Sequence, residues 1–425
     1  MNGISLLHKL AAQPSAAVLR NNSIQLKEGQ LIRAKVLELF PGRQALLGIA
    51  DKRLLAALDI SLEKGSFYWF TVKEGRRTGV PVLSALKTEG AGALLPDILK
   101  NIPQELLKAH RSFVDGVVNR GLPATADELK AILNWLNEMP KADRPKAEEA
   151  ALTVLNRSLP VSAGTLSSLY HAANEQSLFS SLKMLREELL EMPLRSNNAN
   201  KLLELTDRLL SEDGYGDLSL GKRIKAAGYH LGMHEEAQWL KMLGKQEYVQ
   251  RDAEHVKMLL HAFAKEQLGT GAGNLADHLL FKLAGQALLS QENGHLQYSL
   301  LQIPLSYQGF QGDATIQWTG SRKDNKQIDP SYCRILFLVN LPSLKETMID
   351  VQIQNKAVSI FIHHGASAEP DYSNYKEELK QGLQELGYVL TSVKTSGRGK
   401  ELEAGLLHSL TKVSRPFYRG VDLKI

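Results

Sequence analysis

The most restrictive feature of this 425-residue sequence is a series of strand-like segments between Tyr332 and Val393. Residues 334–339 (RILFLV) form a continuous apolar run, as a strand buried on both faces requires. Residues 349–354 alternate apolar and polar side chains with a period of two, which predicts one dry face and one solvent-facing face. We therefore expect a sheet in this part of the chain.

A tight hairpin and a single helix complete this pattern. Asn355 and Lys356 separate the second strand from a third alternating segment, and asparagine tolerates the positive φ that a short hairpin turn requires. Helically spaced apolar side chains then predict a helix with a narrow stripe that can lie on the sheet: Tyr372, Tyr375, Leu379, Leu383 and Leu386. Because residues 388–393 predict a returning strand, the expected order is strand, strand, strand, helix, strand.

These elements resemble the C-terminal domain of flagellar hook-length control proteins. The resemblance covers the last quarter of the chain and rests on the turn at residues 341–344 (LPSL), the alternating strand after it, the hairpin, and a helix that ends at residues 383–387 (LQELG). The family's turn usually reads Leu-Pro, two residues, Leu-Gly, whereas here only Ser343 separates the proline from Leu344, and Lys345 replaces the glycine. The long Gln-, Ser- and Pro-rich ruler region of full-length members is also missing.

The resemblance implies a non-enzymatic interaction protein that contacts the cytoplasmic domain of a type III export-gate component, or a stand-alone relative of it, and influences which substrates are exported. The expected contacts are the turn, the polar face of the next strand and the basic end of the chain. By residue, these are Leu341, Pro342, Leu344, Asp350, Gln352, Arg398, Lys400, Arg415 and Arg419. Residues 394–425 carry seven basic and three acidic side chains, a net charge of +4, so this end is either a solvated tail or a strip that docks on an acidic partner.

Length and composition limit the remaining choices. A chain of 425 residues with 43% apolar side chains suits two or three domains, and its net charge of +5 permits acidic partners without the strongly basic character of a dedicated nucleic-acid binder. The single cysteine, Cys333, excludes an internal disulfide and a cysteine-based zinc site, and fits a reducing compartment. Since neither a signal peptide nor a membrane-spanning run is evident, we expect a cytoplasmic protein without a membrane span, with type III export left open.

Residues 29–88 change to short strands separated by turn residues. Five short strands with little helix predict a small closed barrel of the OB kind, because closure removes the open edges of so short a sheet. Residues 67–70 (FYWF) are aromatic and lie close in sequence to Lys73, Arg76 and Arg77. Single-stranded nucleic acids stack their bases on aromatic side chains and pair their phosphates with basic ones. Nucleic-acid binding by the barrel is therefore the alternative function, although strand alternation turns half of these rings inward and the other two can instead cover another domain.

The central part of the chain has the periodicity of helices and an internal duplication. Residues 121–129 (GLPATADEL) recur in outline as residues 158–166 (SLPVSAGTL), and Thr125 with Glu128 predicts a capping box at the first copy. Because repeat arrays generally need three or more copies, a duplicated helical hairpin describes this region better than a solenoid. A polar run near residues 196–200 predicts a break between two helical halves.

Several motifs imitate catalytic or metal-binding sites. The glycine-rich residues 269–273 have no preceding strand and no following Lys-Ser or Lys-Thr, so they predict a break between helices rather than a phosphate loop. His230 and His234 are four apart on a helix, but the glutamate of a zinc-protease motif and a third ligand are missing. His363 and His364 are consecutive on a strand and point to opposite faces. We therefore predict no catalytic residue, no metal and no cofactor, while an enzyme whose groups converge only in space stays an alternative.

The sequence thus predicts a multi-domain α+β protein. The expected parts are a flexible N-terminal segment (1–28), a small OB-like β-barrel (29–88), an all-helical middle (91–293), a mixed sheet with one packed helix (294–394) and a basic tail (395–425). The expected function is non-enzymatic protein binding, with nucleic-acid binding by the barrel as the alternative.

Overall fold

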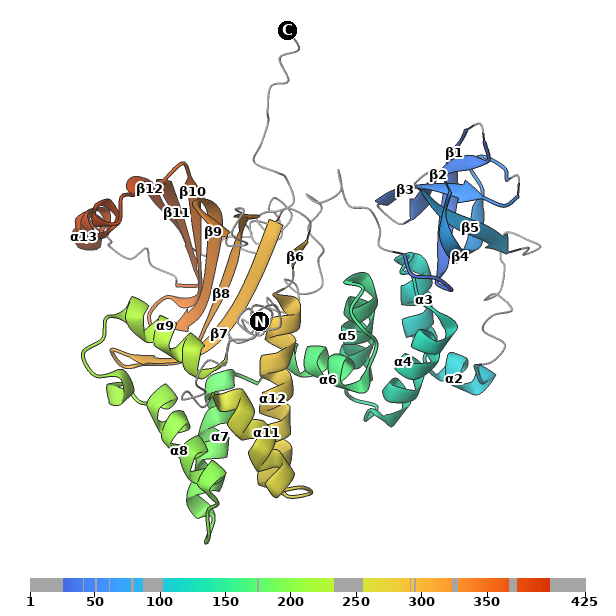
Figure 1. Cartoon of the computed structure of the whole chain (residues 1–425). Coiled ribbons are helices and arrows are strands. Elements are labelled where there is room, and N and C mark those ends of the chain that lie inside the picture. Colours follow the sequence, from blue (N-terminus) through green and yellow to red (C-terminus); the bar gives the residue numbers. More distant parts are fainter. Residues whose placement is uncertain are drawn as a thin grey trace, which may run out of the picture. The chain divides into compact units, whose positions relative to one another are not determined.

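The computed structural model describes residues 26–40, 42–49, 52–60, 62–77, 80–86, 102–173, 176–232, 255–290, 292–293, 296–322, 328–366 and 373–397. The chain forms two compact units that divide between Tyr170 and His171. The first unit contains a barrel and helices, and the second contains helices and a large sheet (Figure 1). The predicted multi-domain α+β architecture is therefore confirmed.

A closed barrel occupies the N-terminal part of the first unit. Its strands are β1 (Leu31–Phe40), β2 (Gln44–Ile49), β3 (Lys52–Leu58), β4 (Phe67–Arg77) and β5 (Val80–Leu86). The order around the barrel is β1-β2-β3-β5-β4, and the pairing is antiparallel except between β3 and β5. Alternate side chains point inward and build an apolar core that includes Ile32, Val36, Leu47, Phe70 and Leu83. The predicted small barrel is confirmed.

The helices of the first unit follow the barrel. They are α2 (Gln104–Ala109), α3 (Arg111–Asn119), α4 (Ala126–Glu138), α5 (Arg144–Asn156) and α6 (Ala163–Ala172), of which His171 and Ala172 belong to the second unit. The predicted capping box begins α4: the Thr125 hydroxyl accepts from the Glu128 N–H at 3.1 Å, and the Glu128 carboxylate accepts from the Thr125 N–H at 2.8 Å. Just before this cap, the backbones of Leu31 and Ala124 exchange hydrogen bonds of 2.8 and 3.2 Å, which tie α4 to strand β1.

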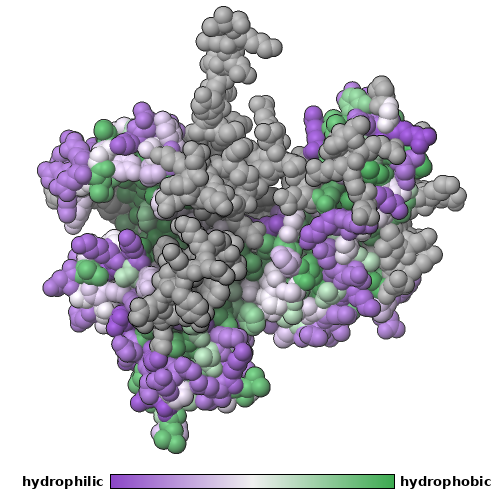
Figure 2. Space-filling view, viewed as in Figure 1, coloured by the Kyte–Doolittle hydropathy of each residue, from purple (hydrophilic) through white to green (hydrophobic). Residues whose placement is uncertain are grey.

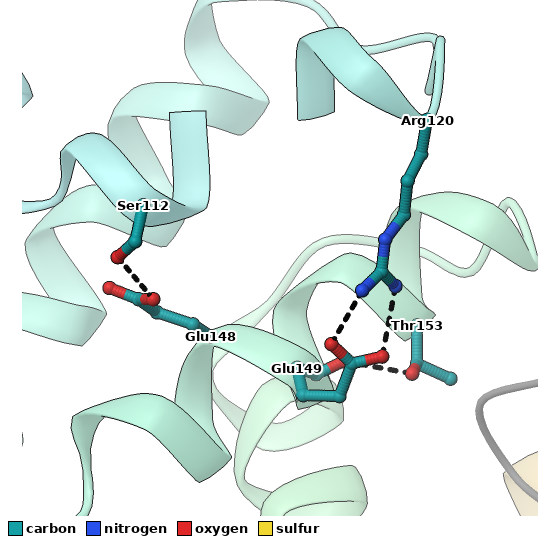
Figure 3. A network of polar contacts seen from close by, with 5 residues as sticks. All are labelled: Ser112, Arg120, Glu148, Glu149 and Thr153. Atoms are coloured by element: carbon teal, nitrogen blue, oxygen red, sulfur yellow. Dashed lines mark hydrogen bonds and ion pairs between the residues drawn. The ribbon is translucent and has the colours of Figure 1, made fainter. Parts of the chain in front are cut away.

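Polar contacts fix α3 against α5 (Figure 3). Arg120 donates two parallel hydrogen bonds to the Glu149 carboxylate, at 2.9 and 2.8 Å. Ser112 donates to the Glu148 carboxylate at 2.6 Å, and the Thr153 hydroxyl donates to the Glu149 carbonyl at 2.8 Å. The contacts of Ser112 with Glu148 and of Arg120 with Glu149 therefore join α3 to α5, whereas that of Thr153 lies within α5.

Helices also form the first part of the second unit. They are α7 (Leu178–Glu191), α8 (Asn197–Leu210), α9 (Leu220–His230), α11 (Val256–Glu266) and α12 (Gly271–Leu289). Ser177, Ser196 and Thr270 cap α7, α8 and α12, each with a side chain that accepts a backbone N–H. Residues 267–270 separate α11 from α12, so the glycine-rich residues 269–273 mark a break between helices, as predicted. Residues 196–200 begin α8, downstream of the point where the two units divide.

A sheet of seven described strands completes the second unit. In spatial order from one edge, the strands are β12 (Val389–Ser396), β11 (Ala357–His364), β10 (Lys345–Gln354), β9 (Ile328–Leu341), β8 (Phe310–Arg322), β7 (Leu296–Tyr307) and β6 (Glu292–Asn293). Neighbours are antiparallel except β11 and β12, which α13 (Ser373–Glu385) connects. Asn355 and Lys356 have φ values of 49° and 65°, so the predicted hairpin turn and the predicted order from β9 to β12 are confirmed.

Buried polar groups join the helices to β7 and β8. Asp313 of β8 accepts from two backbone N–H groups at the start of α7, at 2.7 and 2.8 Å, and from the Gln302 side chain at 2.8 Å. Lys282 of α12 donates to the Gln176 carbonyl at 2.8 Å. Burial raises the pKa of Asp313 and lowers the pKa of Lys282 to about 8. These groups orient α7 and α12 on the sheet, because a buried polar group is stable only when it is paired.

Candidate functional site

The turn between β9 and β10 is accessible and its backbone is fixed. Pro342 is exposed, and Leu341 and Leu344 on either side of it are half-buried. At the end of β11, the Gly365 N–H donates to the carbonyls of Leu344 and Glu346, each at 2.9 Å. The three predicted turn residues therefore lie on one rigid rim of the sheet.

The predicted polar face of β10 is buried at its centre. Asp350 is 4% exposed and Arg334 of β9 is 7% exposed, and the guanidinium donates to both carboxylate oxygens at 2.8 and 2.7 Å. The half-buried Gln352 amide donates to the same carboxylate at 3.1 Å. The expectation that Asp350 faces solvent is wrong, because a bidentate arginine balances its charge inside the sheet.

The opposite face of the same strands is apolar and only half-buried. It carries Ile335 and Phe337 of β9 and Ile349, Val351 and Ile353 of β10, which the register places side by side. In Figure 2, hydrophobic surface is visible in the hollow between this end of the sheet and α9. The face that the alternation predicts to be dry is therefore partly open.

Helix α13 leaves part of its apolar stripe in solvent. Tyr375 is 68% exposed and Leu386, just beyond the helix end, is 74% exposed, whereas Leu383 is half-buried. Tyr372 lies outside the described residues. The prediction that the stripe lies on the sheet is wrong for Tyr375, Leu379 (38% exposed) and Leu386, because α13 packs chiefly against the edge strand β12.

The four predicted basic contacts belong to the end of the chain. Arg398, Lys400, Arg415 and Arg419 lie outside the described residues, so their role stays a prediction. Lys394, on the edge strand β12, is exposed, and its ammonium lies 5.4 Å from the centroid of the Phe361 ring. Positive charge therefore reaches the described edge of the sheet.

The aromatic rings of β4 divide between the two sides of the barrel wall. Phe70 is fully buried and Tyr68 packs against the same core, while Phe67 is 57% exposed and Trp69 is half-buried. Two rings thus point inward, as the alternation predicts. The guanidinium of Arg33 on β1 lies 4.9 Å from the centroid of the Phe67 ring, and the Arg33 register partner on β4 is Trp69.

The cations around these rings differ from those predicted along β4. Lys73 is exposed, and the side chains of Arg76 and Arg77 lie outside the described part of the structure. Sequence reasoning missed Arg33 and Lys35, because only the pairing of β1 with β4 brings them to the rings. The available signal was their alternation with buried apolar residues on β1, which places both on the outer side of the barrel.

Of the histidines singled out by the sequence, the structure describes His230, His363 and His364. Among the described residues, no three histidine, cysteine, aspartate or glutamate side chains are placed to hold an ion. His230 lies among tyrosine rings at the end of α9, and His234 lies outside the described residues. His363 is half-buried and His364 is fully buried, on opposite faces of β11 as predicted.

These features define a mixed α+β protein with an accessible turn, a partly open apolar sheet face and an aromatic and basic barrel surface. No protein-family model matches the chain. The chain is similar to the uncharacterized protein YlqG of Bacillus subtilis (strain 168), with 29% identity over 211 residues that span 49% of this chain and 36% of that protein. None of the helices in the described ranges combines the length and hydrophobicity that crossing a bilayer requires.

Proposed function

We propose that this protein is a non-enzymatic interaction protein that binds the cytoplasmic domain of a type III export-gate component, or a stand-alone relative of it, and influences which substrates are exported. It acts in the cytoplasm. The proposal combines the resemblance to hook-length control proteins with one observation: the exposed turn at Pro342 and the half-open apolar face belong to the same pair of strands, β9 and β10.

This pair of strands supplies two properties that a docking surface needs. Covering the apolar face removes it from water, which stabilises a complex by roughly 25 cal/mol per Å² before the cost of association. The turn adds a fixed rim, because Gly365 and the buried pair of Arg334 with Asp350 hold the strands in place. A rigid surface loses little conformational entropy on binding, so more of the contact energy appears as affinity.

The test measures binding of the full chain to the purified export-gate cytoplasmic domain of the same organism by calorimetry. Leu344→Ser replaces an apolar side chain at the rim and should weaken binding about tenfold, the loss expected for an apolar contact near the centre of an interface. Leu194→Ser is the matched control, because Leu194 is 88% exposed in the link between α7 and α8. The dissociation constant of the Leu194→Ser variant should equal that of the unaltered chain.

Removing residues 398–425 tests the basic end separately. A segment that docks on an acidic partner predicts weaker binding and a shallower salt dependence after the removal, whereas a solvated tail predicts no change. The proposal fails if the unaltered chain does not bind at micromolar concentrations, or if Leu344→Ser and Leu194→Ser weaken binding equally.

A further inference from the structure

We infer that the outer face of the barrel formed by β1, β3 and β4 binds single-stranded nucleic acid, with Phe67 and Trp69 stacking on bases and with Arg33, Lys35 and Arg53 contacting phosphates. None of these residues belongs to the surface proposed for the export gate. The two proposals can therefore fail independently.

The strand register brings these side chains onto one face in two neighbouring rows. The first row, read across four adjacent strands, is Arg53, Gly48, Lys35 and Phe67. The second row pairs Arg33 of β1 with Trp69 of β4. Since residues two apart on a strand share a face, both rows point away from the buried core.

The cations of this face are available to a phosphate backbone. Residues 26–86 carry ten basic and six acidic side chains, a net charge of +4. In the described part of the chain, Arg33 and Lys35 have no carboxylate within 4.0 Å and lie over the Phe67 ring, 4.9 and 5.8 Å from its centroid. Cations that are not already paired release counterions from a nucleic acid when they bind it, which favours association.

The pair of outward rings distinguishes nucleic acid from an acidic protein. Phe67 and Trp69 are two residues apart on one strand, which places them roughly 7 Å apart along it. An extended single strand can stack successive bases on two such rings while its phosphates reach the flanking cations. The carboxylates of an acidic peptide can pair with the cations, but they do not supply the aromatic bases that stack on the rings.

The test uses fluorescence anisotropy of the full chain with a labelled oligothymidylate of about 20 nucleotides, longer than the roughly 4–16 nucleotides that one OB barrel covers. The dissociation constant should rise with salt, with a logarithmic slope of roughly 0.7 for each phosphate contact. Phe67→Ala and Trp69→Ala should each weaken binding about tenfold, within the range measured for the loss of one stacked base.

Arg33→Gln and Arg43→Gln form a matched pair, because each removes one arginine charge from the barrel. Arg43 lies in the turn between β1 and β2, next to the pair of Phe40 with Gln44. Phe40, at that end of β1, is about 17 Å along the strand from Lys35. Arg33→Gln should weaken binding and reduce the salt slope by roughly 0.7, and Arg43→Gln should leave the slope unchanged.

Three results overturn the inference. They are no salt-dependent binding by the unaltered chain at low ionic strength, full binding by both alanine variants, and equal loss from the two arginine variants. Binding of polyglutamate in place of the oligonucleotide, with the same dependence on Arg33, would instead assign the face to an acidic protein partner. The exposed position of Phe67 means that its substitution tests binding without removing core packing.

Discussion

The barrel and the large sheet differ in whether their strand edges are paired and in whether they bury charged groups. The barrel closes on itself, and among its described residues the buried side chains are apolar apart from Gln30. The sheet stays open, ends at β12, and buries polar and charged groups that include Asp350 and Arg334.

This difference affects which side chains the barrel and the sheet expose on their surfaces. The barrel draws its stability from apolar packing inside the wall, so its outer face is free to carry rings and cations. The sheet depends on polar groups that must stay paired. Its rim at Pro342 is exposed, and the apolar face opposite Asp350 is half-buried. Four predictions test this comparison, beginning with the largest effect.

Phe70→Ala should destabilise the barrel by roughly 4 kcal/mol, because the ring is fully buried and its removal leaves a cavity. Phe67→Ala, the same change three residues earlier on the outer side, should alter stability by less than about 0.5 kcal/mol. Denaturant unfolding, with amide exchange of β1 to β5 as the local readout, measures both. Similar losses from the two variants would contradict an inward Phe70 and an outward Phe67.

Arg334→Met should destabilise the sheet by roughly 3 kcal/mol, because it leaves the buried Asp350 carboxylate without its partner. The double variant with Asp350→Leu removes both charges and should recover more than half of this loss. Denaturant unfolding with amide exchange of β9 and β10 provides the measurement. If the double variant were as unstable as the single one, the pair would not be the source of the cost.

Acid should weaken the second unit through His171. Burial, together with His278 and Lys282, lowers the pKa of His171 to about 4. The unfolded chain therefore binds a proton near pH 6.5 that the folded state accepts only near pH 4, so stability falls as the pH drops through this window, by about 2 kcal/mol at pH 5.

The control for this effect is His171→Phe, which keeps a ring beside His278 and Phe281 but cannot titrate. Its unfolding free energy should fall by about 2 kcal/mol less than that of the unaltered chain between pH 7 and pH 5. Amide exchange of the barrel strands should not report this difference. The same pH dependence in both proteins would show that His171 is not the group responsible.

Thr125→Ala should have the smallest effect, about 1 kcal/mol, because it removes the cap of α4 beside the backbone contact between Ala124 and the barrel. Ser162→Ala is the matched change in the duplicated segment, where the hydroxyl accepts from the Thr165 N–H at 3.1 Å and no glutamate reciprocates. The loss of stability from Ser162→Ala should be smaller than that from Thr125→Ala. Thermal unfolding of the two variants gives the comparison, and the reverse order would exclude the capping box as the cause.

Local patterns were enough to predict most elements of the fold. The alternation from residue 349 and the turn at Asn355 involve neighbours in sequence, so they specify strands and a hairpin without knowledge of the rest of the molecule. The capping box at Thr125 is local in the same way. The closed barrel was predictable because five short strands with open edges need closure.

The candidate surfaces were harder to predict, because each depends on a partner far away in the sequence. Alternation places Asp350 on one face of β10, but only the pairing with β9 supplies Arg334 and makes burial of that face favourable. Alternation likewise separates Phe67 from Phe70, but only the pairing of β1 with β4 selects Arg33 as the cation over the outer ring.

The amino-acid sequence by itself therefore determined which segments are strands and helices and where they turn, since backbone preference and side-chain period act over a few residues. Tertiary structure decided which faces are covered, which charges are paired and which rings meet cations. The physical reason is that burial and pairing belong to contacts between strands, and the register that creates those contacts is set by the whole fold.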